Sequence, residues 1–272
     1  MREKKLHVTR FVVGGPVDLT IAVVADLHGR DPAQCLAALA AEKPGLICVA
    51  GDALETMQPP GAPCDNGEKA RERARWLHRF LHLIDGLVYR HAGQQTEENW
   101  ANAMRFFRVA KQIAPVVYAT GNHDYWLAPE EMRRIRDAGV TLLSNSSVSM
   151  RFGGEMVEIG GLTSRDGLYW LTDFARKPGY RVLICHRPEY FAPHIRVHDI
   201  PLVLSGHAHG GQWRVFGRGL FSPGQGLLPQ YTRGIYEGRL VVSAGLSNTA
   251  NLPRINNPVE LVIVKVRRET AE

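Results

Sequence analysis

The chain has 272 residues, a formal net charge of +6 and a composition of 44% hydrophobic and 22% charged residues. These values are ordinary for a globular protein and exclude a largely disordered chain, while the length allows one large domain or two small ones. No apolar run is long enough to cross a bilayer. The mild basic excess is compatible with phosphorylated substrates, nucleic acid or anionic lipid, and it decides among none of them.

The start of the chain and its cysteines predict the compartment. Basic residues precede Phe11-Val12-Val13, but this apolar run is too short for the core of a signal peptide. Cys35, Cys48, Cys64 and Cys185 are scattered without CxxC spacing, which is typical of reduced thiols. We therefore expect a cytoplasmic protein, with any membrane contact being peripheral.

The first predicted strand covers residues 20–25, a continuous apolar and β-branched run typical of a strand buried on both faces. Asp26 and His28 follow it, and a carboxylate with an imidazole suits a borderline divalent metal such as Mn, Fe or Zn. We expect the two side chains to point the same way, because residues i and i+2 of an extended chain share a side.

A helix and a second buried strand come next. Alanines and leucines at helical spacing predict a helix over residues 31–43, which Asp31-Pro32 would begin and Pro44-Gly45 would end. The strand over residues 46–50 ends in Gly51-Asp52. In open α/β sheets ligands bind at the carboxyl ends of strands, although Asp52 taken alone is better explained as a cap or turn residue.

Residues 58 to about 113 are predicted to form a helical insert, longer than the core needs. A Pro- and Gly-rich loop begins it, and helices are expected over residues 68–88 and 96–113. Apolar side chains line one face of the second helix, among them Trp100, Met104 and Phe107. Two interpretations stay open: an outer helical layer of the fold, or a cap over the site that meets lipid.

A third strand is predicted over residues 115–120, directly before Gly121-Asn122-His123-Asp124. Asn122 offers a neutral oxygen, and His123 could serve as a ligand, a proton donor or a phosphate contact. A helix over residues 130–138 and strands over 140–143 and 156–159 are expected to follow, with a turn near Gly153-Gly154.

The second half of the chain supplies two more strand ends with histidines. The strand over residues 181–185 precedes His186, and the strand over 202–205 precedes His207 and His209, which lie in a Gly-rich turn. At i and i+2, these two rings are expected to converge on one spot, which suits a metal site with open positions. The alternative is a surface turn that happens to contain two histidines.

Two closing strands, over residues 239–243 and 259–266, are predicted to lie in a second sheet. Five predicted strands therefore end in metal-capable groups, although each group alone has a structural explanation as a cap or core residue. The other histidines fall on no strand end and are interpreted as ordinary; they are His7, His78, His82, His91, His194 and His198.

The order of these motifs resembles the calcineurin-like metallophosphoesterases. Asp-x-His, Gly-Asp, Gly-Asn-His-Asp, a lone His and Gly-His-x-His all occur in sequence within residues 20–209. The segments 206–212, 245–248 and 256–260 resemble more narrowly a bacterial branch related to membrane-associated phosphodiesterases. The resemblance implies an α/β fold of two mixed β-sheets packed face to face with helices outside, a four-layer αββα sandwich, in a single domain over residues 1–272.

The resemblance also implies two divalent metal ions, Mn, Fe or Zn. The ligands implied for the first are Asp26, His28 and His209, and those for the second are Asn122, His186 and His207. Asp52 would bridge the two ions. His123 would contact the scissile phosphate and protonate the leaving group, oriented by Asp124.

General chemistry agrees with that assignment. Two cations about 3.5–4 Å apart can share a hydroxide, lower its pKa and clamp the attacking and leaving oxygens of an in-line displacement. Phosphoryl transfer needs mainly positioning and charge neutralisation, which such a pair supplies. Arg30 is a further candidate for contact with substrate phosphate, although a surface arginine is the simpler interpretation.

We therefore expect a metal-dependent phosphoesterase that acts on phosphodiester or pyrophosphate bonds. A lipid-linked or nucleotide substrate, or another phosphorylated small molecule, would suit it, and the insert is a candidate for peripheral membrane contact. Nucleic acid is not expected as a partner, because no basic stripe with interleaved aromatics is present. The alternatives are a phosphomonoesterase and a non-catalytic scaffold on the same fold.

Overall fold

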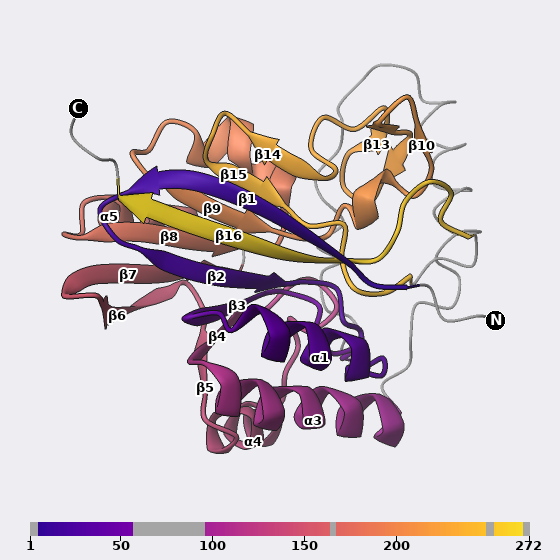
Figure 1. The fold of residues 1–272 in the computed structure, drawn as a ribbon, viewed down its shortest axis with the longest axis horizontal. Helices are drawn as coiled ribbons and strands as arrows, with labels where there is room; N and C mark the ends of the chain where they lie inside the picture. The colour runs from indigo at the N-terminus through magenta and orange to yellow at the C-terminus, as the bar shows by residue number, and fades with distance from the viewer. Residues whose placement is uncertain (1–4, 57–95, 164–166, 249–252, 269–272) are drawn as a thin grey trace.

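In the computed structural model, which describes residues 5–56, 96–163, 167–248 and 253–268, two six-stranded mixed sheets stack face to face (Figure 1). The first sheet has the order β1 (His7–Gly15), β16 (Glu260–Arg268), β2 (Leu19–Val24), β3 (Leu46–Ala50), β4 (Val116–Ala119), β5 (Val140–Leu143). The second has the order β14 (Gly234–Tyr236), β15 (Leu240–Val242), β9 (Leu202–Ser205), β8 (Tyr180–Cys185), β7 (Glu155–Leu162), β6 (Ser146–Phe152).

The alternation of side chains along β2 shows how the layers form. Ile21 and Val23 point into the core between the two sheets, where they join Ile184 and Leu204 of the second sheet. Ala22 and Val24 point the other way, into a cluster shared with the helices. A strand that is buried on both faces reads as a continuous apolar run, which is the pattern seen in its sequence.

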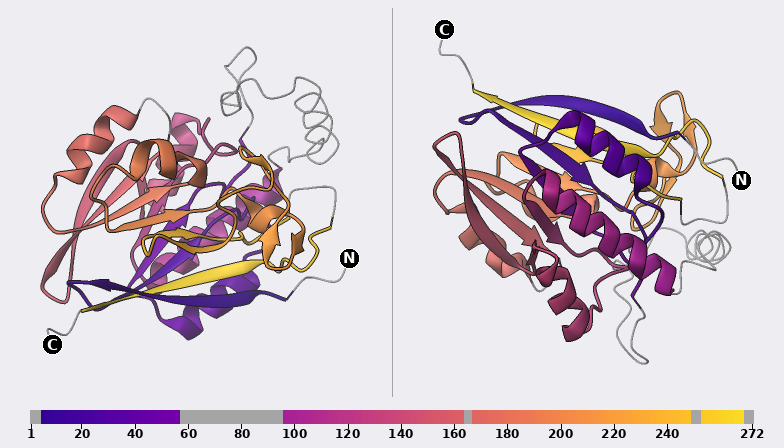
Figure 2. Two further views of the ribbon diagram at one scale, coloured as in Figure 1. Left: turned by 90° about the horizontal axis from the view of Figure 1, so that it is seen from above. Right: turned by 60° about the horizontal axis from the view of Figure 1, so that its bottom comes forward.

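Helices cover both outer faces and complete the predicted four-layer αββα sandwich, which the structure confirms. The outer face of the first sheet carries α1 (Ala33–Glu42), α3 (Glu97–Ile113) and α4 (Pro129–Asp137), as Figure 2 shows from two further directions. On the second sheet, α5 (Leu168–Ala175) buries Leu171 and Phe174 against strand residues. None of the helices in the described part of the chain is long and apolar enough to span a membrane.

The helix α3 belongs to the layer on the first sheet. Thr96 caps it by accepting a hydrogen bond from the Asn99 backbone N–H at 3.1 Å, which satisfies one of the free donors of the first turn. Its apolar face, with Met104 and Phe107, is buried in the apolar cluster between the helices and the first sheet. The other helix predicted in the insert, over residues 68–88, lies outside the described residues.

The predicted position of the last strand was wrong. β15 lies in the second sheet as expected, but β16 pairs with β1 and β2 in the first. The apolar pattern of residues 259–266 identifies a buried strand and carries no information about its partners, because both sheets offer the same kind of apolar face. β1, β6 and β14 were not predicted; β6 in particular is only half-buried, and its sequence has a weak apolar pattern.

Two smaller hairpins follow β9 and lie beside its carboxyl end. The first pairs β10 (Arg214–Val215) with β11 (Arg218–Gly219), and the second pairs β12 (Phe221–Ser222) with β13 (Gly226–Leu227). Figure 1 places β10 and β13 together at one end of the molecule, away from α5 at the other end.

Candidate metal centre

The predicted strand ends meet at one edge of the stacked sheets. The turns after β2 and β3 are joined by backbone hydrogen bonds, from the Asp26 N–H to the Gly51 carbonyl at 3.2 Å and from the His28 N–H to the Asp52 carbonyl at 2.9 Å. Across the sheets, the His207 N–H donates to the Asp26 carboxylate at 3.2 Å. Polar groups from both sheets are thereby drawn into one buried region.

The first cluster contains Asp26, His28 and His209, all buried. From Asp26 Oδ1, the Nε2 atoms of the two rings lie 4.0 Å (His28) and 3.7 Å (His209) away. Burial and the nearby guanidinium of Arg254 lower the pKa of His209 well below its ordinary value. The ring is therefore neutral, which metal ligation requires.

The second cluster contains Asp52, His186 and His207, also buried. Asp52 Oδ2 lies 3.0 Å from His186 Nε2 and 3.9 Å from His28 Nε2 in the first cluster. The same carboxylate oxygen therefore faces both clusters, which is the position predicted for a bridging ligand.

Asn122 is placed beside the second cluster by Gly121. A Cβ atom on Gly121 would lie 2.2 Å from Asp52 Oδ1 and 2.7 Å from the His186 ring, so only glycine lets the turn after β4 approach this closely. Asn122 Oδ1 is buried without a hydrogen-bond partner among the described residues.

The unsatisfied atoms of these clusters fit metal ions. His28 Nε2 and His207 Nε2, like Asn122 Oδ1, are buried and find no hydrogen-bond partner in the part of the chain that the structure describes. Buried polar atoms are normally satisfied, because an unpaired one costs about 1–3 kcal/mol. Imidazole, carboxylate and amide donors gathered around two adjacent points are the ligand set expected for borderline divalent cations. The residues therefore fit two such ions.

Outer contacts hold the imidazoles in place. His28 Nδ1 is hydrogen-bonded to the Glu55 carboxylate, and His186 Nδ1 lies 2.7 Å from the Ala50 carbonyl oxygen. One guanidinium nitrogen of Arg254 lies 3.0 Å from His209 Nδ1, and another donates a hydrogen bond to the Ala244 carbonyl. Partners of this kind orient metal-ligating rings and commonly change metal affinity by about 10–100-fold when removed.

The spacing of His207 and His209 predicted that both rings converge on one spot, which was wrong, whereas the resemblance assigned the two histidines to different ions. His207 belongs to the second cluster and His209 to the first. The prediction assumed an extended backbone for each pair of ligands at i and i+2. That backbone is absent, since Asp26, His28, His207 and His209 all have positive φ angles between 45° and 66°. Left-handed backbone is costly for residues other than glycine, and its concentration in these turns is typical of a functional site.

His123 lies at the border of the two clusters with its side chain about 25% exposed. Its Nδ1 is hydrogen-bonded to Glu55 Oε2 at 2.8 Å, and its backbone N–H donates to Asp52 Oδ1 at 2.9 Å. Burial disfavours the charged ring, but the carboxylates of Asp52 and Glu55 outweigh it and raise the pKa of His123 to about 9. In the metal-free chain the ring therefore carries a proton at neutral pH.

The prediction that Asp124 orients His123 is corrected by these contacts. The Asp124 carboxylate accepts hydrogen bonds from the Ala53 N–H at 2.7 Å, the Gly121 N–H and the Tyr118 hydroxyl. Asp124 thus ties the turns after β3 and β4 together, whereas Glu55 holds the imidazole.

Sequence reasoning missed Glu55 and Arg254. The spacing Gly51-Asp52-x-x-Glu55 was an available signal, since it places a second acid one short turn after the predicted ligand. Arg254 follows no strand and stands in no motif, and only tertiary packing brings it to His209. Arg30 follows His28 in the same turn, and its side chain is exposed.

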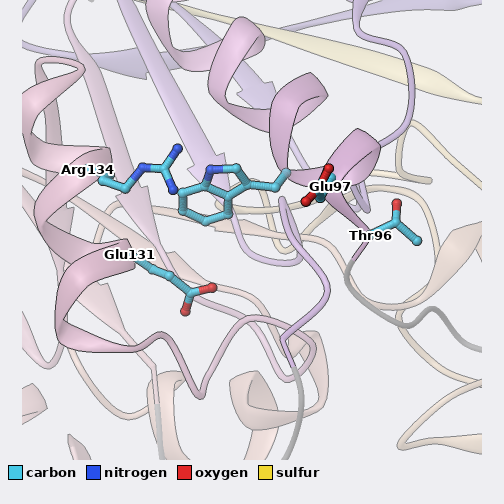
Figure 3. Close-up of a pocket in the computed structure, with 5 residues that line it drawn as sticks. Thr96, Glu97, Glu131 and Arg134 are labelled. Carbon is cyan, nitrogen blue, oxygen red and sulfur yellow. The ribbon is translucent and has the colours of Figure 1, made fainter.

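A separate shallow pocket lies between α3 and α4 (Figure 3). The Arg134 guanidinium stacks over the Trp100 indole there, 4.8 Å from the ring centroid. No predicted site residue lines this pocket, which is formed by Thr96, Glu97, Trp100, Glu131 and Arg134.

Comparison with known proteins identifies relatives of the chain. The protein YpbG of Bacillus subtilis (strain 168) is 32% identical over 109 residues, which are 38% of this chain and 42% of YpbG. The metallophosphoesterase Cj0846 of Campylobacter jejuni is 29% identical over 165 residues, which are 55% of this chain and 41% of Cj0846. The matches therefore span about two fifths of the length of these relatives.

Among solved structures, the calcineurin-like phosphoesterase YfkN from Bacillus subtilis aligns with a TM-score of 0.44 and 11% identity, covering 85% of this chain and 82% of that chain. A family model described as calcineurin-like phosphoesterase matches residues 19–211, from β2 to the turn that carries His209. That span contains every residue of the two clusters. The chain therefore belongs to the calcineurin-like phosphoesterase family.

Proposed function

We propose that this chain is a dimetal phosphoesterase that hydrolyses phosphodiester or pyrophosphate bonds. The observation that carries the proposal is the pair of buried Asp/His clusters with Asp52 between them, 3.0 Å from His186 and 3.9 Å from His28. A structural role alone would not explain three buried polar atoms left unsatisfied in one place.

The seven predicted ligands would hold the two ions in the clusters described above. Asp26, His28 and His209 would hold one, Asn122, His186 and His207 the other, with Asp52 shared. When bound, a pair of divalent cations neutralises phosphate charge and makes water nucleophilic near neutral pH.

His123 would supply the leaving group with a proton. Its Nδ1 is engaged by Glu55, which leaves Nε2 as the proton donor, and its side chain is partly exposed where a substrate can reach it. A diester releases an alkoxide, which is a poor leaving group, so a positioned general acid contributes most to this reaction. This is the reason we favour alkyl diesters over esters with activated leaving groups; pyrophosphates, which release a phosphate group, stay in the proposal as a second substrate class.

The substrate class is also a proposal. The phosphorylated small molecules that fit are a nucleotide phosphodiester and a lipid-linked diphosphate, each of which presents two phosphate-bound groups of which one must leave. Arg30, exposed beside His28, is a candidate phosphate contact. A cytoplasmic location stays a prediction.

Hydrolysis of two p-nitrophenyl esters tests the function. The chain is assayed with Mn²⁺ on p-nitrophenyl phosphate and on bis-p-nitrophenyl phosphate, and then with an excess of chelator. We expect diesterase activity that the chelator abolishes. Activity on the monoester alone would establish a phosphomonoesterase instead, and two bound metals without turnover of any ester would favour a scaffold. The variant His123→Ala is assayed in the same way. His198→Ala is its matched control, because His198 lies outside both clusters.

A further inference from the structure

Exposed apolar side chains gather on the two hairpins after β9. We define the hairpin patch as five residues with exposed fractions of 46–102%, namely Val215, Phe216, Leu227, Leu228 and Ile255. Phe216 is 102% exposed at the tip between β10 and β11. Single exposed apolar residues are normal on protein surfaces, but a contiguous group marks an interaction site.

Hydrogen bonds show that the segments that carry these residues lie side by side. Leu220 belongs to both hairpins: its N–H donates to the Trp213 carbonyl at 2.9 Å, which continues the β10–β11 pairing, and its carbonyl accepts from the Leu228 N–H at 2.9 Å, which continues the β12–β13 pairing. The Arg214 N–H donates to the Ile255 carbonyl at 3.0 Å, which brings the last member alongside β10. Figure 1 shows β10 and β13 next to each other in agreement with these contacts.

The patch is attached directly to the metal centre. The Leu220 N–H donates to the Gly211 carbonyl at 3.1 Å, and the Arg214 guanidinium donates to the Gly210 carbonyl at 2.8 Å. Both carbonyls belong to the turn that begins with His209, a member of the first cluster. A surface that docks through the hairpins would therefore be held close to the site.

The hairpin tip carries an exposed cation. Of the three arginines in residues 200–236, Arg214 donates to the Gly210 carbonyl and Arg233 forms an ion pair with Glu260 at 2.7 Å, so Arg218 is the one whose side chain is exposed. Arg218 is exposed and follows Phe216 by two positions at the hairpin tip. Apolar side chains that project beside an exposed cation complement a surface of anionic phospholipid.

We propose that the hairpin patch docks the protein on anionic lipid bilayers, with Phe216 entering the boundary between headgroups and acyl chains. Three of the five side chains are Val or Leu and one is Ile, so the patch suits acyl chains better than the stacked bases of nucleic acid. This site differs from the predicted one, since α3, the described part of the insert, buries its apolar face in the core. Binding to the bilayer does not depend on the proposed function, whereas action on a lipid-linked substrate rests on it.

Vesicle sedimentation tests the proposal. The full chain is mixed with phosphatidylglycerol/phosphatidylcholine vesicles and with pure phosphatidylcholine vesicles, and the bound fraction is measured over a range of salt concentrations. We expect binding to the anionic vesicles that weakens with salt, and a reduction of about tenfold or more in partitioning for Phe216→Ser, as the loss of one buried aromatic side chain requires. Arg218→Gln should reduce binding to anionic vesicles at low salt and have no effect at high salt.

Tyr169→Ser is the matched control, because Tyr169 is 90% exposed on α5 at the other end of the molecule. It should bind vesicles as the unaltered chain does. Absence of binding to anionic vesicles, or equal effects of Phe216→Ser and Tyr169→Ser, would overturn the proposal. Hydrolysis of the soluble diester should be unchanged in Phe216→Ser, so a failure of membrane docking is distinguished from a failure of the proposed function.

Discussion

Asp52 lies between the two clusters. Its Oδ2 atom faces His186 and His28, while its Oδ1 atom accepts the backbone N–H of His123. Burial would raise the pKa of this carboxyl, but the imidazoles of His186 and His123 outweigh it and hold the pKa well below the ordinary value. Asp52 is therefore ionised at neutral pH, and its negative charge is available to two cations.

Asp52→Asn should lose both metal and activity. The amide keeps the shape of the carboxylate but removes the negative charge between the clusters. We expect fewer than two bound Mn²⁺ ions by isothermal titration calorimetry, and a loss of activity of more than about 100-fold, exceeding the effect of outer contacts. Asp173→Asn, at an exposed position on α5, should bind metal normally. Two ions bound with unchanged affinity in Asp52→Asn would contradict the bridging role.

His123→Ala should keep metal and lose rate. In the proposed ligand assignment His123 holds neither ion, so metal stoichiometry should stay at the unaltered value. Removing a general acid should lower kcat by about 10²–10⁴-fold on an alkyl phosphodiester and by less on a p-nitrophenyl ester, whose leaving group needs little protonation. If the alkyl diester were hydrolysed at the normal rate, His123 would not be the acid.

At the scale of elements, pairs of strands and turns are held by a few buried polar contacts. β6 and β7 are tied together by Glu158, whose carboxylate accepts hydrogen bonds from Ser147 and Ser149 and from the Lys177 ammonium at 2.7 Å. Burial would raise the pKa of Glu158, but these donors outweigh it and lower the pKa below the ordinary value. The carboxylate is 4% exposed and so contributes to stability as an ion.

Glu158→Gln should destabilise the fold in a pH-dependent way. A folded-state pKa below the unfolded value of about 4.3 means that the stabilisation is present above that pH and is lost as the pH falls through the folded pKa. Urea unfolding should show a loss of about 1–3 kcal/mol at pH 7 that shrinks below about pH 4.

The control for this prediction is Glu130→Gln, which removes an exposed ion pair with Arg133 on α4. Exposed pairs of this kind contribute about 0–1 kcal/mol, so the control should change little. Equal destabilisation of Glu158→Gln at pH 7 and pH 3.5 would show that the ionised carboxylate is not the stabilising group.

At the scale of the whole molecule, the metal centre joins the two sheets. Asp26, His28, Asp52 and Asn122 come from the first sheet, and His186, His207 and His209 from the second. Ions held between them would link the sheets at this edge, in addition to the apolar core between their faces. The unfolded chain has no such preformed site, so metal binding adds to folding stability.

Removal of metal should therefore lower the melting temperature. A ligand at 100 times its Kd adds about 2.7 kcal/mol, so saturating Mn²⁺ should raise Tm measurably above the value with chelator. Asp52→Asn in Mn²⁺ should show less of this increase. A Tm that does not respond to chelator, in a chain shown to bind metal, would mean that the ions do not link the sheets.

The sequence by itself determined the buried strands that carry the site and the polar residues at their ends. Buried strands such as β2, β3 and β9 are continuous apolar runs, and their carboxyl ends are visible locally as the point where Asp or His follows. Because parallel strands deliver their ends to one edge, this local information was enough to gather the metal-capable residues in one region.

Only the tertiary structure decided which side chains meet. The contact of Glu55 with His123 and the contact of Arg254 with His209 depend on how the two sheets and their turns pack. The pairing of β16 with β2 is decided in the same way. These contacts join residues far apart in the chain, and apolar patterning records that a residue is buried without recording which neighbour it faces.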